Sequence, residues 1–260
     1  MSGAESISRA IRAANDAGRP ALVAFLTAGY PDRDQFIDHL RQVASAADVV
    51  EIGVPFTDPM ADGVTIQRAS QGALEAGVSL RWILDELKAN DTGDTPLLLM
   101  GYLNPMLSLG YETLAKDSAE SGVSGFIVPD LPYEESAPMR TALEAYGLGL
   151  VQLVTPVTPE PRLKTLCEAS GGFVYAVTVT GITGGAKDGG DGGANEGIAG
   201  YLKRVRDASP LPVCAGFGIR TREQVAELAP HAEGLVVGSA LVEVLERGED
   251  PAGFLNGLRS

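Results

Sequence analysis

The chain has few cysteines and no apolar run long enough to cross a membrane. Its two cysteines, Cys167 and Cys214, are too few for a disulfide framework or a cysteine-ligated zinc cluster, and they suit a reducing compartment. The longest uncharged stretch, residues 169–186, is rich in glycine and threonine, whereas a membrane helix needs about 20 mostly apolar residues. The first residues lack the apolar segment of a signal peptide. We therefore expect a cytoplasmic protein.

Positive charge is also scarce. The sequence contains 20 Lys and Arg against 34 Asp and Glu, a formal net charge of −14. Such a field repels phosphate backbones and anionic lipid surfaces at long range. We expect neither nucleic acid nor membrane as a partner.

Eight apolar runs of strand length recur along the chain, and segments with helical spacing separate most of them. The runs cover residues 21–29, 49–55, 96–102, 125–130, 147–156, 172–179, 211–218 and 234–240. Eight strand-plus-helix units in 260 residues average about 32 residues each, the usual length of a βα unit. No linker or change of composition divides the chain, so residues 1–260 are predicted to form one domain.

This alternation favours a (β/α)8 TIM barrel, an α/β fold, with an extra N-terminal helix. A doubly wound open sheet is the alternative, but the first strand-to-helix turn lacks the GxGxxG dinucleotide signature, and eight strands close a barrel. Ile7, Ile11 and Ala14 form one stripe of the N-terminal helix. Thr221 and Gln224 predict a helix start with a capping box. Active sites of this fold lie at the C-terminal ends of the strands.

Two carboxylates follow from that rule. Glu51 interrupts an apolar strand, and alternation places it on the face opposite Val50 and Ile52, pointing into the barrel. A carboxyl in such surroundings has a raised pKa and can exchange protons near neutrality, although a structural ion pair is an alternative. Asp58 and Asp62 lie in the following loop, where either could simply be a turn or cap residue. The alternative is that Glu51 and Asp62 reach one cavity, from the strand end and from the loop.

Glycine-containing segments after the last three strands indicate a phosphate site. On a barrel, these loops and a short helix commonly hold phosphate through backbone amides. The alternative is that the glycines only form tight turns. The candidates are Thr183, Gly184, Gly216, Phe217, Gly218, Gly238 and Ser239. A phosphorylated small molecule is the expected substrate.

Several other chemistries have little support. His39 and His231 do not follow strands, so both are expected on the surface and no metal site is predicted. The strand cores contain no lysine for a Schiff base, and Cys214 has no histidine partner to make it a nucleophile. The sequence therefore predicts catalysis by carboxyl groups that exchange protons.

Four segments in order resemble the tryptophan synthase alpha chain family: EIGVPFTDPMADG (51–63), PDLPYEES (129–136), GFGIRT (216–221) and VGSALV (237–242). The resemblance runs from about Phe25 to Val242. It implies a carbon–carbon lyase of tryptophan biosynthesis that cleaves indole-3-glycerol phosphate to indole and glyceraldehyde 3-phosphate by a retro-aldol reaction. It also implies no cofactor in this chain, and a beta chain that carries pyridoxal phosphate and joins it in an alpha2beta2 heterotetramer.

The resemblance assigns roles to individual positions. Glu51 matches the family's catalytic glutamate and Asp62 its catalytic aspartate, and Tyr175 matches a tyrosine that lines the site. Asp130 and Asn104 are expected to organise loops or the partner surface. Five strand-end residues are expected to surround the indole ring or, equally, to be plain barrel core: Phe25, Met100, Tyr102, Ile127 and Pro129.

The sequence departs from the family pattern in two places. Val64 stands where the family usually has proline, and the glycine-rich loop 180–197 lacks the usual arginine, for which Lys187 is an imperfect substitute. These departures leave two alternatives open. One is a stand-alone lyase that releases free indole, and the other is a weakly catalytic barrel that activates a beta chain.

Overall fold

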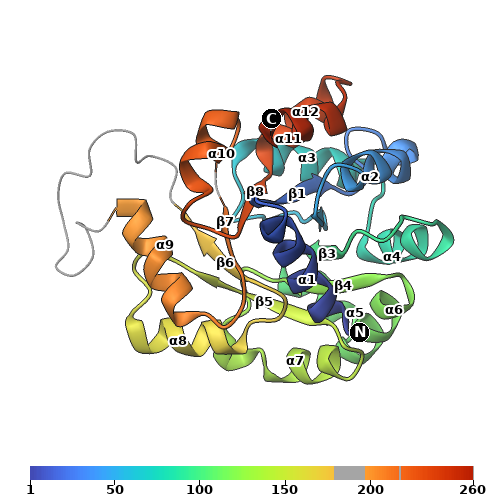
Figure 1. The fold of residues 1–260 in the computed structure, drawn as a ribbon. Coiled ribbons are helices and arrows are strands. Elements are labelled where there is room, and N and C mark those ends of the chain that lie inside the picture. The colour runs from blue at the N-terminus through green and yellow to red at the C-terminus, as the bar shows by residue number, and fades with distance from the viewer. Residues whose placement is uncertain (179–196, 217, 260) are drawn as a thin grey trace.

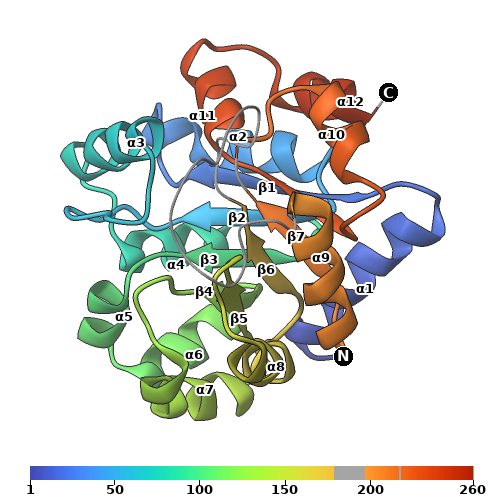
Figure 2. The same ribbon diagram turned by 90° about the vertical axis from the view of Figure 1, so that its left-hand side faces the viewer.

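The computed structural model is a closed barrel of parallel strands, and it describes residues 1–178, 197–216 and 218–259 (Figures 1 and 2). Each strand pairs with the next in sequence, and β8 closes on β1. The strands are β1 (Ala21–Thr27), β2 (Val49–Gly53), β3 (Leu97–Met100), β4 (Val123–Ile127), β5 (Gly149–Val154), β6 (Val174–Val177), β7 (Val213–Gly216) and β8 (Gly234–Val237). Each of the eight predicted runs thus overlaps one strand, although β4 begins two residues before the predicted run 125–130, and the predicted barrel is confirmed.

Helices surround the barrel on its outside (Figure 2). They are α1 (Gly3–Asp16), α2 (Phe36–Ala44), α3 (Val64–Glu75), α4 (Leu80–Ala89), α5 (Leu103–Leu109), α6 (Tyr111–Glu120), α7 (Ala137–Glu144), α8 (Glu160–Ala169), α9 (Gly197–Ala208), α10 (Arg222–Leu228), α11 (Ser239–Glu246) and α12 (Pro251–Arg259), with short 3-10 turns η1 (Arg33–Gln35) and η2 (Tyr133–Glu135). The patterns in the sequence did not predict α4, α5 or α12, which are second helices between strands or at the end of the chain.

The strand residues divide into two layers, as alternation requires. Val50 and Ile52 face outward into the core cluster shared with the surrounding helices, whereas Val49 faces the barrel interior. The interior layer is filled by side chains such as Phe173 and Val236, so the barrel is a packed core and not a pore.

Helix α1 closes the end of the barrel where the strands begin. Ile7 and Ile11 are fully buried in the interior cluster. The Ala4 amide donates to the Gly147 carbonyl at 3.3 Å, and the Asn15 side chain donates to the Glu233 carbonyl at 2.8 Å, just before β5 and β8. The barrel is therefore accessible only at the opposite end, within the part of the chain that the structure describes.

The two histidines are less exposed than the sequence predicts. His39 is half-buried, not on the surface, and burial lowers the pKa of its imidazole. His231 is half-buried as well.

Cys167 and Cys214 are buried free thiols. Within the described ranges, none of the helices has the length and apolar character to cross a membrane.

Candidate active site

Glu51 lies inside the barrel, on β2. Its register partners are Phe25 on β1 and Leu98 on β3, and only 1% of the residue is exposed. Neither carboxylate oxygen has a hydrogen-bond partner among the described residues. Burial without a partner disfavours the charged form and raises the pKa of Glu51 to about 8. The predicted inward orientation is confirmed. Among the described residues, Glu51 has no partner for the structural ion pair that was the alternative.

Asp62 lies in the loop between β2 and α3 and is half-buried. The Tyr102 hydroxyl donates to its Oδ2 at 3.1 Å and accepts a hydrogen bond from the Ala61 amide at 2.9 Å. The Phe56 ring stacks on Tyr102, with centroids 5.1 Å apart. Burial raises the pKa of Asp62 to about 6, against the lowering effect of the Tyr102 hydrogen bond. The two carboxyl groups therefore have different pKa values.

A mostly apolar cavity adjoins Asp62 at the C-terminal ends of the first strands. The cavity has a volume of only about 10 Å³, so its apolar and aromatic walls and one carboxylate match a flat ring with an N–H group by their chemistry and not by the present space. Of the five predicted wall residues, four line this cavity: Phe25, Met100, Tyr102 and Pro129. Ile127 does not line it, because it is fully buried in the interior cluster.

Tyr175 lies in the interior, beside the end of β7. A Cβ at Gly216 would be 2.3 Å from the Tyr175 hydroxyl, so this position accepts only glycine without a shift. Burial, and then the nearby charge of Glu51, raise the pKa of Tyr175 well above its ordinary value. No hydrogen bond joins Tyr175 to Glu51 among the described residues. Cys214 is also buried, and burial raises the pKa of its thiol, as expected of a packing residue.

The glycines predicted to bind phosphate lie at the same end of the barrel. Gly218 follows β7 and has a positive φ of 71°. Gly238 is the N-cap residue of α11, and Ser239 begins that helix, whose first amides have no intrahelical acceptor. A Cβ at Gly238 would be 3.8 Å from Phe25 Cβ, so this helix start adjoins the cavity wall. Thr183, Gly184 and Phe217, and likewise Lys187, lie outside the described residues.

The remaining candidates, Asp58, Asp130 and Asn104, do not line the cavity. Asp58 is exposed and accepts a hydrogen bond from Thr57 at 2.6 Å. Asp130 accepts the Leu103 amide at 2.9 Å at the start of α5, as expected of a residue that organises loops, and Asn104 is exposed. In the described ranges, no three His, Cys, Asp or Glu side chains gather as a metal site would require.

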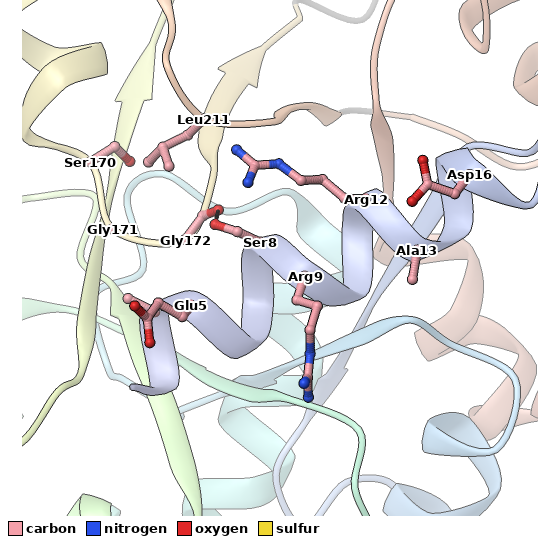
Figure 3. A pocket seen from close by; sticks show the side chains of 11 residues that line it. Glu5, Ser8, Arg9, Arg12, Ala13, Asp16, Ser170, Gly171, Gly172 and Leu211 are labelled. Carbon is pink, nitrogen blue, oxygen red and sulfur yellow. Dashed lines mark hydrogen bonds between the residues drawn. The ribbon is translucent and has the colours of Figure 1, made fainter. Parts of the chain in front are cut away.

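An open groove beside α1 lies at the other end of the barrel. It is bounded by Ser8 and Arg12 of α1, Gly172 before β6, and Leu211 before β7. Figure 3 shows Ser8 and Arg12 directed toward the 170–172 segment, while Arg9 points away from it. Because α1 separates this groove from the strand C-termini, it is not the site of Glu51 and Asp62.

Known proteins provide an independent comparison. The family model described as tryptophan synthase alpha chain matches residues 11–255. A tryptophan synthase alpha chain of Desulfovibrio desulfuricans is 48% identical over 249 residues, 94% of this chain and 96% of that protein. A solved structure of Mycobacterium tuberculosis tryptophan synthase gives a TM-score of 0.85 at 34% identity, covering 98% of each chain. The solved structure of the tryptophan synthase alpha subunit from Legionella pneumophila gives a TM-score of 0.83 at 33% identity, covering 97% of this chain and 95% of that one.

Proposed function

Because the chain belongs to the tryptophan synthase alpha chain family, we propose that Glu51 and Asp62 carry out its reaction. That reaction is the cleavage of indole-3-glycerol phosphate to indole and glyceraldehyde 3-phosphate, a carbon–carbon lyase step. The observation that best supports the assignment is the buried, unpartnered carboxyl of Glu51. A group with a pKa of about 8 is mostly protonated at neutral pH and can donate a proton.

Glu51 moves both protons in this proposal. It first donates a proton to C3 of the indole ring, which gives an indolenine cation. The hydroxyl on the glycerol carbon next to the ring then loses its proton to the Glu51 carboxylate. The bond between C3 and that carbon breaks, its electron pair returns to the ring, and the carbon becomes the aldehyde. Glu51 regains its proton, so the cycle closes without another donor.

Asp62 stabilises the charged intermediate. Its carboxylate accepts the indole N–H and lies next to the positive charge that develops on the ring. Its pKa of about 6 keeps it ionised at neutral pH, and the Tyr102 hydroxyl fixes its orientation. Phe25, Met100 and Pro129 provide the apolar walls for the ring. Tyr175 and Ile127 are assigned to the site on the family resemblance alone, as are Thr183, Gly184 and Phe217, which lie outside the described residues.

The phosphate is assigned to backbone amides at Gly216, Gly218, Gly238 and Ser239. Gly238 adjoins Phe25 in the wall of the cavity that Asp62 lines, and amides at the start of a helix favour an anion even in a protein of net charge −14. Proton transfer by one carboxyl needs no electron sink, so we assign no cofactor to this chain and place pyridoxal phosphate in the beta chain. The free thiols of Cys167 and Cys214 suit the cytoplasm.

A beta chain is the proposed macromolecular partner, in an alpha2beta2 heterotetramer. Three large apolar side chains are exposed in or beside loops that follow strands. Met60 and Val64 are 84% and 77% exposed around the start of α3, and Val157 after β5 is 86% exposed. We assign these exposed apolar side chains to an interaction surface. Here it rims the end from which indole would leave.

Glu51→Gln tests the mechanism, because the amide keeps the volume of the side chain but cannot transfer the proton. We expect kcat for indole release, measured with a beta chain present, to fall by at least about 100-fold. The melting temperature should not fall, because the neutral amide replaces a neutral carboxyl. Unchanged cleavage in this variant would refute the role of Glu51.

The same assay separates the alternatives for the whole chain. Slow release that a beta chain accelerates supports a biosynthetic subunit. Fast release without a beta chain would instead indicate a stand-alone lyase. Absence of release under both conditions would indicate a binding role.

A further inference from the structure

Glu243, on the first turns of α11, links three segments of the active-site rim. The Arg220 guanidinium donates two hydrogen bonds to it, Nη1 to Oε2 at 2.7 Å and Nη2 to Oε1 at 2.8 Å. The Thr65 hydroxyl, on the first turn of α3, donates to Oε1 at 3.1 Å. One carboxylate therefore contacts the segment after β7 and the start of α3 together.

Each linked segment carries part of the proposed site. Arg220 is two residues beyond Gly218, Thr65 is three residues beyond Asp62, and Glu243 is one helical turn beyond Ser239. The backbone on the β7 side is fixed as well, because the Arg220 amide donates to the Gln224 side chain at 2.7 Å. A shift of Glu243 would therefore move the phosphate-binding glycines relative to the start of α11.

We propose that Glu243 is a positioning residue that holds the two phosphate-binding segments, after β7 and at the start of α11, in the geometry that binds the substrate phosphate. The inference rests on the proposed function of the site, and it assigns Glu243 no contact with the substrate. Arg220 fixes Glu243 by a planar, bidentate ion pair, the geometry with the most directional constraint.

The ion pair contributes more to geometry than to folding. The side chains of Arg220 and Glu243 are 49% and 25% exposed, and ion pairs with such exposure add little to the stability of a fold. The Arg220 hydrogen bonds lower the pKa of Glu243 to about 2, so the pair stays charged over the whole working pH range. A purely structural role would therefore predict almost no effect of substitution, and a positioning role predicts a selective one.

Glu243→Ala and Glu243→Gln test the proposal, with Glu249→Gln as the matched control. Glu249 forms the same kind of pair with Arg247 at 2.7 Å, next to the end of α11. Among the described residues, no hydrogen bond or ion pair joins Glu249 to α3 or to the segment after β7, although the charge of its partner Arg247 acts on Arg220 and Glu243. We expect Glu243→Ala to raise KM for indole-3-glycerol phosphate roughly fivefold, the effect of a weakened phosphate contact. Glu243→Gln should lie between Glu243→Ala and the parent chain, and Glu249→Gln should match the parent chain.

The dephosphorylated substrate, indole-3-glycerol, separates positioning from general damage. Its KM should be the same for the parent chain and Glu243→Ala, because it has no phosphate to bind. Equal losses with both substrates, or no change with either, would overturn the proposal.

Direct titration with glycerol 3-phosphate keeps the inference distinct from the proposed function. If the parent chain does not cleave indole-3-glycerol phosphate, the proposed function fails, and the titration still decides the role of Glu243. Weaker binding to Glu243→Ala than to the parent chain supports the inference. Equal binding to both chains, or no binding to the parent chain, overturns it.

Discussion

The different environments of Glu51 and Asp62 predict a bell-shaped pH profile. Asp62 must be ionised, so activity rises as pH increases through its pKa of about 6. Glu51 must be protonated, so activity falls as pH increases through its pKa of about 8. We expect kcat/KM for indole release to be highest near pH 7 and roughly tenfold lower at pH 9, where about one Glu51 in ten keeps its proton. A rate that stays constant up to pH 10 would contradict the assignment of Glu51 as the proton donor.

Tyr102 adjusts the acidic side of this profile. Its hydroxyl hydrogen bond lowers the pKa of Asp62, so Tyr102→Phe should raise that pKa and shift the acidic limb upward by about one pH unit. The loss of activity should be larger at pH 6 than at pH 7.5, and the alkaline limb should not move. Titration of the substrate phosphate cannot produce this difference, because it is the same for both chains. An unshifted acidic limb would exclude Tyr102 as a positioning residue for Asp62.

The strands and most helices of this fold could be predicted from sequence because their signals are local. Alternation places Glu51 inside the barrel, and the Thr221–Gln224 capping box forms as expected. Most predicted runs extend beyond the strands, as at 147–156 against Gly149–Val154 of β5, because uncharged residues continue past the ends of the ladder, whereas β4 begins before its predicted run. The second helices were missed because alternation of strand and helix suggests one helix per unit. Ser79, whose side chain caps α4, is the visible signal for that helix, whereas α5 has no side-chain cap.

The contacts of the site could be predicted less well, because they join distant segments. The Tyr102–Asp62 hydrogen bond spans 40 residues, and the Arg220–Glu243 pair spans 23. No periodicity within one segment encodes such a pair. The sequence identified the side chains at the strand ends, and tertiary packing decided which of them meet.

At the scale of a strand, the end of β7 is predicted to tolerate only glycine at its last position. A Cβ at Gly216 would overlap the Tyr175 hydroxyl at 2.3 Å inside a filled barrel, so Gly216→Ala must displace a fully packed ring. We expect a loss of about 2 kcal/mol in the free energy of unfolding, measured by urea denaturation. Gly257→Ala in α12 is the control, because nothing lies within 4 Å of its Cβ and alanine favours a helix. Equal stability of both variants would show that β7 can move away from Tyr175.

The whole molecule has two unlike ends. Helix α1 closes the end where the strands begin, with Ile7 and Ile11 packed into the barrel interior. The other end carries Asp62, the phosphate-binding segments and the exposed Met60, Val64 and Val157. A partner that receives a product from the barrel must dock at this second end. The position of the exposed apolar residues therefore agrees with the direction in which indole would leave.

This asymmetry predicts which surface substitutions affect assembly. Val157→Asp places a charge in the apolar rim after β5, and it should weaken binding to a beta chain about tenfold or more, measured by sedimentation or calorimetry. Tyr146→Asp is the matched control: Tyr146 is also an exposed apolar residue, at 47%, but it precedes β5 at the end of the barrel near α1. The control should bind as the parent chain does. Both variants should keep the slow cleavage that needs no partner, because neither residue touches Glu51 or Asp62, and only Val157→Asp should lose the acceleration by a beta chain. If Tyr146→Asp alone weakened binding, the partner would dock at the closed end, and indole could not pass directly from the barrel to it.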